Sequence, residues 1–197
     1  AEKLDVYENT RVRTVEDNKV YYDGGRLQAK WVVIATHYPL INFPGYYFMR
    51  MHQSRSYVQS INNVPEISGM YIDEKENGLS FRSEGDTMLL GGVGHRTGKN
   101  PAASGAPGNY EILRRAAGRL YPNARLSYAW SAQDCMTADG VPFIGKYSQN
   151  TPRLLVATGF NKWGMTSSMV AATLLTDKIT GAGNECMPAF SPQRFSV

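Results

Sequence analysis

Two glycines lie where the sequence predicts that a buried strand turns into a helix. Leu154–Thr158 is apolar and short enough for a buried strand, and a helix is predicted over Met165–Thr180. Gly159 and Gly164 stand in the turn between them, and two serines follow in the first helical turn. Small side chains would let a large planar or anionic ligand approach free backbone N–H groups at the positive end of the helix dipole. The alternative is that the glycines only shape a tight turn, and geometry favours neither interpretation.

Other residue types that could do chemistry are scattered along the chain. His37, His52 and His95 have no cysteine or acidic neighbour at ligand spacing, so no metal site is predicted. The two cysteines, Cys135 and Cys186, provide neither a disulfide framework nor a zinc site. A buried structural thiol is the favoured interpretation of Cys135.

Composition narrows the class of protein. The chain has 197 residues, 42% hydrophobic and 19% charged, which is typical of a folded domain and excludes a disordered chain. The longest apolar run, Trp31–Ala35, is far shorter than the roughly 20 residues of a membrane span. No signal-peptide pattern opens the sequence, so a cytoplasmic location is expected. The net charge of +4 comes from scattered basic residues and does not argue for an anionic partner.

The elements that must position the glycine-containing turn follow an α+β pattern. The first residues predict a β-meander with a tight turn at Asp23–Gly25, and the apolar strand Trp31–Ala35 is expected to be covered on both faces. A loop is expected at 97–108. Four further segments predict a mostly antiparallel sheet: 56–61, 70–72, 79–82 and 88–93.

Two helices complete the pattern. Asn109 is expected to cap the first, which runs to Leu120 and carries three arginines on its polar face. These arginines would suit nucleic acid, but no aromatic residues interleave them, so a solvated face is favoured. The second helix is expected to end at Gly181. Its apolar side is expected to be one row at helical spacing: Met165, Met169, Ala172, Leu175 and Ile179.

The pieces together resemble one family. The turn-dense segment Thr137–Gly145, the following strand and the run Ala157–Thr166 resemble the C-terminal flavin-contacting part of the D-amino-acid-oxidase-type FAD-dependent oxidoreductases. Glycine oxidase and sarcosine oxidase are members of that family. Trp31–Thr36 resembles the strand that ends beside the FAD, and 79–82 with 89–92 resembles the substrate-domain sheet. The ending at 184–194 is similar to the bacterial subfamily in which a Rieske iron–sulfur domain follows.

The resemblance implies a split FAD-binding domain with an inserted substrate domain. It assigns 1–40 to the FAD-binding domain as a β-meander and buried strand, and 41–135 to the substrate domain, with a mostly antiparallel sheet and a helix. It assigns 136–182 to the returning strand and helix of the FAD-binding domain, and 183–197 to a tail or linker. The implied reaction is oxidation of an amine-type or related small substrate by hydride transfer to the flavin. Such chemistry needs positioning more than a protein base, and no catalytic residue is singled out.

The resemblance also implies which residues meet the ligands. Residue by residue, it assigns FAD contacts to Thr36, Gly159, Phe160, Asn161, Gly164, Met165 and Thr166. Asp134 stands where glycine-oxidase-like members have an arginine that pairs with the substrate carboxylate, five residues before the residue matching Asp139. An aspartate would repel a carboxylate, so a substrate that is cationic or neutral near Asp134 is expected. The alternative is that Asp134 only ties the turn before Thr137.

Two features of the family pattern are missing. The closest string to the phosphate-binding G-x-G-x-x-G, Gly92–Thr97, has threonine for the third glycine and leads into a proline-containing loop. The chain is therefore expected to be the C-terminal part of a longer enzyme, to need the missing N-terminal half for FAD binding, and to be inactive alone. A Rieske [2Fe–2S] cluster needs Cys-x-His and Cys-x-x-His pairs, which are absent, so such a cluster would lie beyond Val197.

The expected partners follow from these assignments. They are a small-molecule substrate, the missing N-terminal half and an iron–sulfur electron acceptor, with no membrane and no nucleic acid. The alternative, from another class, is a non-catalytic module that binds nucleic acid or protein through a basic, tyrosine-rich surface. Colour distinguishes the two, because bound flavin absorbs visible light, whereas an RNA module would bind with strong salt dependence.

Overall fold

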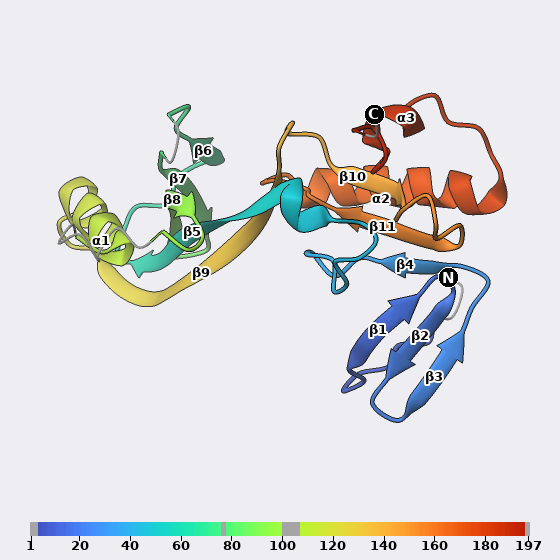
Figure 1. Cartoon of the computed structure of the whole chain (residues 1–197). Coiled ribbons are helices and arrows are strands. Elements are labelled where there is room, and N and C mark those ends of the chain that lie inside the picture. The colour runs from blue at the N-terminus through green and yellow to red at the C-terminus, as the bar shows by residue number, and fades with distance from the viewer. Residues whose placement is uncertain (1–3, 76–77, 100–106, 196–197) are drawn as a thin grey trace. The chain divides into compact units, whose positions relative to one another are not determined.

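The structure is a computed structural model that describes residues 4–75, 78–99 and 107–195. The described residues form a mixed α+β fold with mostly antiparallel strands, which confirms the predicted fold class (Figure 1). The chain divides into two compact units. Unit 1 comprises Ala1–Met51 and Cys135–Val197, and unit 2 comprises His52–Asp134.

The first sheet of unit 1 is the meander that the sequence predicts. It consists of β1 (Val12–Glu16), β2 (Lys19–Tyr22) and β3 (Gly25–Gln28), paired antiparallel in that order. Val15 on β1 is buried and joins the adjacent core cluster. Leu27 on β3 is 51% exposed, so the meander leaves part of its apolar surface open.

The second sheet of unit 1 has the order β10–β11–β4. β11 (Leu154–Thr158) pairs antiparallel with β10 (Phe143–Lys146) and parallel with β4 (Val32–Ile34). β11 is buried along its whole length, as predicted for the strand before the turn. The expectation that the β4 segment is covered on both faces is wrong for this part of the protein, because Val33 is 41% exposed.

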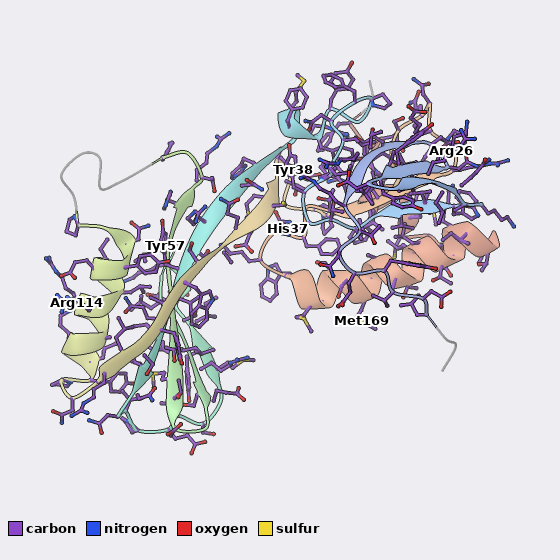
Figure 2. The ribbon with its side chains drawn as sticks, turned by 90° about the horizontal axis from the view of Figure 1, so that it is seen from below. Arg26, His37, Tyr38, Tyr57, Arg114 and Met169 are labelled. Atoms are coloured by element: carbon purple, nitrogen blue, oxygen red, sulfur yellow. The ribbon has the colours of Figure 1, made fainter. Side chains whose placement is uncertain are left out.

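Helix α2 (Gly164–Thr180) packs on β10 and β11 and ends, as predicted, at Gly181 with φ of +80°. Only part of the apolar row predicted for it is packed: Leu175 is buried, whereas Met165 is 87% exposed and Met169, labelled in Figure 2, is 70% exposed. The packed side of α2 also includes residues outside that row. Its buried residues are Ala171, Leu174 and Leu175.

The last residues of the chain also pack on unit 1. Helix α3 (Met187–Phe190) contacts β10, and both of its terminal residues pack against the cluster under α2. Pro192 is fully buried. Residues 41–51, which the sequence assigns to the other domain, also lie in unit 1, where Tyr47 from the 3-10 helix η1 (Tyr47–Met49) is buried in the core.

Unit 2 is built on a five-stranded sheet with the order β6–β7–β8–β5–β9. Helix α1 (Asn109–Leu120) packs on β8, and Leu113 and Ala117 join the core with Met88 and Leu90. The chain passes between the two units within β5 and β9. The strands are β5 (Met51–Asn62), β6 (Met70–Ile72), β7 (Ser80–Glu84), β8 (Thr87–Arg96) and β9 (Arg125–Thr137).

Two details of unit 2 differ from the predictions. The N-cap of α1 is Gly108, not Asn109, whose buried side chain instead donates to the Val93 carbonyl at 2.8 Å. Of the three arginines on α1, Arg114 (labelled in Figure 2) and Arg115 are exposed and both pair with Glu111. Residues 100–106 of the expected loop at 97–108 lie outside the described residues.

Candidate functional site

The turn between β11 and α2, residues 159–163, begins with a glycine that the packing requires. Gly159 has φ of +69°, a backbone conformation that residues other than glycine rarely adopt. A Cβ atom on Gly159 would overlap the Cγ2 methyl of Thr137 and lie 3.1 Å from Sδ of Met51. The chain itself therefore accounts for glycine at this position.

Asn161 fastens the same turn to the segment that precedes β10. Its side-chain oxygen accepts the Thr137 N–H at 3.0 Å, and its amide nitrogen donates to the carbonyls of Gly140 at 2.9 Å and Gly159 at 3.1 Å. Its backbone N–H donates to the backbone carbonyl of Cys135, also at 3.0 Å. Asn161 has φ of +52°, and these four hydrogen bonds hold it there.

The other end of the turn is open. A Cβ atom built on Gly164 would meet nothing within 4 Å, and Gly164 has no positive φ that would require glycine. The N-terminus of α2 has no side-chain cap and no acidic residue in its first turn. Three predicted FAD contacts, Gly164, Met165 and Thr166, are exposed here beside the positive end of the helix dipole.

The end of β4 is tied to the end of β11. The hydroxyl of Thr158 donates to the carbonyl of His37, which has φ of +64°. Thr36, the predicted FAD contact on this strand end, is exposed, and its hydroxyl donates to the Tyr38 carbonyl at 2.8 Å. Both strand ends therefore present a fixed backbone at one edge of the sheet.

A mostly apolar cavity of about 450 Å³ lies between these strand ends and α2. The predicted contacts Gly159 and Phe160 line it, and Thr36 lies between two residues that do, Ala35 and His37. Asp134 is not among the lining residues; it is half-buried and is the last residue of unit 2. The remaining lining residues are Val33, Ala157, Thr158, Ser168, Ala171, Ala172 and Leu175.

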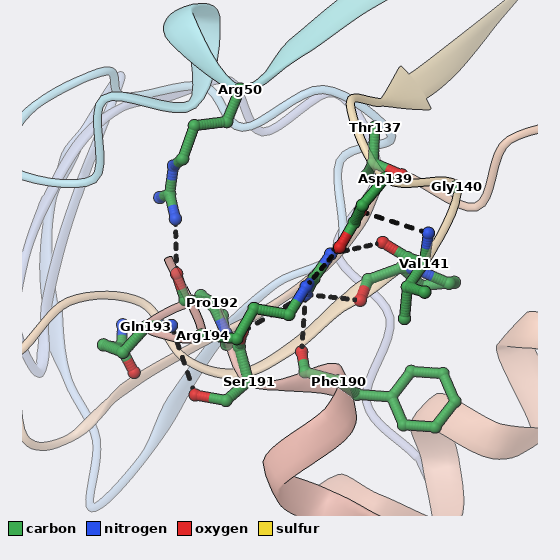
Figure 3. Close-up of polar contacts among 12 residues, drawn as sticks. Arg50, Thr137, Asp139, Gly140, Val141, Phe190, Ser191, Pro192, Gln193 and Arg194 are labelled. Atoms are coloured by element: carbon green, nitrogen blue, oxygen red, sulfur yellow. Dashed lines mark hydrogen bonds and ion pairs between the residues drawn. The ribbon is translucent and has the colours of Figure 1, made fainter. Parts of the chain in front are cut away.

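An ion pair beside the turn is not predicted from the sequence. Arg194 donates to both carboxylate oxygens of Asp139, at 2.7 and 2.9 Å, as Figure 3 shows. These hydrogen bonds hold the pKa of Asp139 below its ordinary value, against the opposing effect of partial burial. The two residues are 55 positions apart, so no spacing signal could have joined them.

Three observations concern metal ligands, helix length and the cysteines. No group of three or more His, Cys, Asp or Glu side chains among the described residues could hold a metal ion. Within the same residues, no helix has the length and apolar character needed to span a membrane. Cys135 is 1% exposed and not in a disulfide, which confirms the prediction of a buried thiol.

Known proteins are similar to this chain in sequence and in fold. Residues 1–178 match the sequence model of the family described as FAD dependent oxidoreductase. The protein YhfW of Bacillus subtilis, named as a Rieske 2Fe-2S iron-sulfur protein, is 39% identical over 176 residues. That match covers 87% of this chain but only 34% of YhfW.

Solved structures agree on the fold. Glycine oxidase from Geobacillus kaustophilus superposes with a TM-score of 0.77 at 22% identity, over 97% of this chain and 54% of its own. L-proline dehydrogenase from P. horikoshii superposes with a TM-score of 0.75 at 20% identity, over 95% of this chain and 54% of its own. The chain thus spans about half the length of these structures and about a third of YhfW.

Proposed function

The chain belongs to the FAD-dependent oxidoreductase family, and we propose that it is the C-terminal part of an enzyme that oxidises an amine-type or related small substrate by hydride transfer to FAD. The observation that carries the proposal is the contrast between the two glycines of the β11–α2 turn. Gly159 is required by its own surroundings, whereas nothing in the described chain lies near a side chain at Gly164. A ligand held against α2 gives a reason for the second glycine.

The residues at this corner fit a flavin ring. A planar ring needs close approach to backbone, and Gly164 provides open space at the start of α2. The first-turn N–H groups of α2 would stabilise negative charge on the ring, and the apolar cavity beside Gly159 and Phe160 would exclude water. When bound, FAD supplies a two-electron acceptor. The proposed contacts remain Thr36, Gly159, Phe160, Asn161, Gly164, Met165 and Thr166.

The rest of the FAD site is assigned to sequence outside these residues. We assign unit 1 to the FAD-binding domain and unit 2 to the substrate domain, which moves residues 41–51 to the FAD-binding side. Within the described residues β4 pairs only with β11, and α2 exposes Met165 and Met169. An open strand edge and an apolar helix face support packing against the N-terminal half, which would also supply the missing phosphate-binding unit.

The substrate and the electron acceptor are narrower parts of the proposal. Asp134 replaces the arginine expected to hold a carboxylate in glycine-oxidase-like members, so the substrate is proposed to be cationic or neutral near it. The name of YhfW supports an iron–sulfur acceptor in the parent protein.

The proposal is tested by purifying the parent protein and titrating it with FAD while the visible spectrum is recorded. The parent is expected to bind FAD, and residues 1–197 alone are expected to bind it with a Kd weaker than about 1 µM. A parent protein that stays colourless with excess FAD would contradict the proposed function. Submicromolar binding by residues 1–197 alone would contradict the assignment of the phosphate site to the missing half.

A further inference from the structure

The guanidinium of Arg194 is surrounded by acceptors from two segments of unit 1, residues 139–142 and residues 190–191 (Figure 3). Besides the carboxylate of Asp139, it donates to the carbonyls of Val141 at 2.6 Å and Pro142 at 3.1 Å. Its side chain is 12% exposed, and its Cζ lies 4.0 Å from the ring centroid of Phe143. A fork that is bonded on every side and stacked on a ring has one orientation available to it.

Arg194 fixes the turn at Asp139 and Gly140. The Asp139 carboxylate receives the arginine fork, and one of its oxygens also accepts the N–H of Val141 at 3.2 Å. Gly140 has φ of +75°, which completes the tight turn. Because the carboxylate is held from both sides, the carbonyl of Gly140 points in a fixed direction.

The Asp139–Gly140 segment is hydrogen-bonded to the β11–α2 turn. The Gly140 carbonyl accepts a hydrogen bond from the side-chain amide nitrogen of Asn161, and the same nitrogen donates to the carbonyl of Gly159. Arg194 is therefore linked to the β11–α2 turn by its hydrogen bonds to Asp139, by the peptide bond from Asp139 to Gly140, and by the hydrogen bond from Asn161 to Gly140.

From these links we infer that Arg194 is a positioning residue for the flavin-contacting turn, an inference that rests on the function proposed above. Among the described residues, Arg194 forms hydrogen bonds, an ion pair and ring contacts with residues other than the proposed FAD contacts, and it acts on those contacts through the Asp139–Gly140 turn. Its role is to hold Asn161 in its left-handed conformation and so to fix where the start of α2 meets the ring.

Anchoring of residues 187–195 does not by itself explain these contacts. Pro192 is fully buried, α3 packs on the core, and Arg50 donates to the carbonyl of Pro192. These contacts hold the final segment without the fork between Arg194 and Asp139. Loss of this ion pair is therefore expected to increase the mobility of the Asp139–Gly140 turn and the β11–α2 turn more than that of residues 187–195.

The first test is amide hydrogen exchange in the FAD-free parent protein carrying Arg194→Ala. The N–H groups of Thr137 and Asn161 are expected to exchange at least about tenfold faster than in the wild type, because local opening no longer breaks the fork. The control is Arg13→Ala, which removes another two-point arginine–aspartate pair of unit 1, with Asp23, at an exposed place on the meander. That variant is expected to leave exchange at Thr137 and Asn161 unchanged.

The second test measures FAD binding and the absorption spectrum of the bound flavin. Arg194→Ala is expected to raise the Kd for FAD about tenfold and to shift the visible band, because the ring meets a displaced turn. Arg13→Ala is expected to change neither. Asp139→Asn keeps the size of the side chain and is expected to reproduce the effects in weaker form; it replaces Arg194→Ala if that variant does not fold.

The results of these tests distinguish the positioning role of Arg194 from the proposed flavin-dependent function. Unchanged exchange at Thr137 and Asn161, or faster exchange with unchanged FAD affinity and spectrum, would overturn the positioning role alone. A wild-type parent that does not bind FAD would overturn the proposed function and the positioning role with it.

Discussion

The two ends of the β11–α2 turn carry the same residue type for opposite reasons. At one end, Gly159 has positive φ and faces Thr137 so closely that a Cβ atom would overlap it. At the other end, Gly164 has no such restriction and faces open space. The first glycine is explained by packing within unit 1. Nothing in the described residues requires glycine at residue 164, and this contrast separates the structural part of the turn from the part assigned to FAD.

The largest predicted effect is at the packed end. Gly159→Val adds overpacking against Thr137 to a backbone conformation that β-branched residues avoid. The free energy of unfolding of the FAD-free parent is expected to fall by about 3 kcal/mol or more. Urea denaturation followed by circular dichroism measures it, and a loss below about 1 kcal/mol would show that packing does not require glycine at residue 159.

A smaller effect is predicted at Asn161. Asn161→Ala removes the side chain that bonds Thr137, Gly140 and Gly159, and is expected to cost about 2 kcal/mol of unfolding free energy. Asn161→Gly is the matched control, since it also loses the hydrogen bonds but adopts positive φ freely. In the same urea experiment, Asn161→Gly is expected to have a higher free energy of unfolding than Asn161→Ala. Equal stability of Asn161→Ala and the wild type would contradict the fastening role.

A still smaller effect is predicted for the pH dependence of stability. The folded-state pKa of Asp139 is lowered by Arg194, so the pair stabilises the protein above the ordinary aspartate pKa near 4 and loses that contribution as pH falls through the folded-state pKa. The contribution is expected to be about 1 kcal/mol for this partly exposed carboxyl. Urea unfolding at pH 7 and at pH 3 is expected to show a smaller difference in Asp139→Asn than in the wild type. Identical pH dependence in the two proteins would argue against the ion pair.

The smallest effect on stability is predicted at the open end of the turn. Gly164→Ala adds a methyl group that meets nothing within 4 Å, and alanine is a better helix residue than glycine. The free energy of unfolding of the FAD-free parent is expected to change by less than about 0.5 kcal/mol. A large loss of stability would show that Gly164 serves the fold, as in the tight-turn alternative.

Local patterns predict the elements around the turn well. The strand Leu154–Thr158 and the helix end at Gly181 agree with the structure, because a short apolar run and a glycine in the left-handed region depend on neighbouring residues. β9 has no matching prediction: Leu126, Tyr128 and Trp130 stand at every second position, but most residues of the strand are exposed. Helical spacing placed Met165 and Met169 in one row, yet spacing cannot say which row of a largely apolar helix faces the core.

The contacts that organise the site depend on distant parts of the chain. The pairing of Asp139 with Arg194 brings the last segment back to a turn far earlier in the sequence, and the proline-containing ending gives no pattern that predicts it. The need for glycine at residue 159 depends on Thr137 and Met51, which reach it through tertiary packing. The FAD contacts themselves remain predictions from the family resemblance.

The most direct test of the proposed flavin site compares two open glycines at helix starts in the parent protein. Gly164→Val introduces a side chain where FAD is proposed to lie, and Gly108→Val is the control at the N-cap of α1, where a Cβ atom also meets nothing within 4 Å. Titration with FAD, monitored by flavin fluorescence, is expected to show at least about a hundredfold weaker binding by Gly164→Val, a loss of about 2.7 kcal/mol. Gly108→Val is expected to bind like the wild type. Equal FAD affinity in all three proteins would contradict the account.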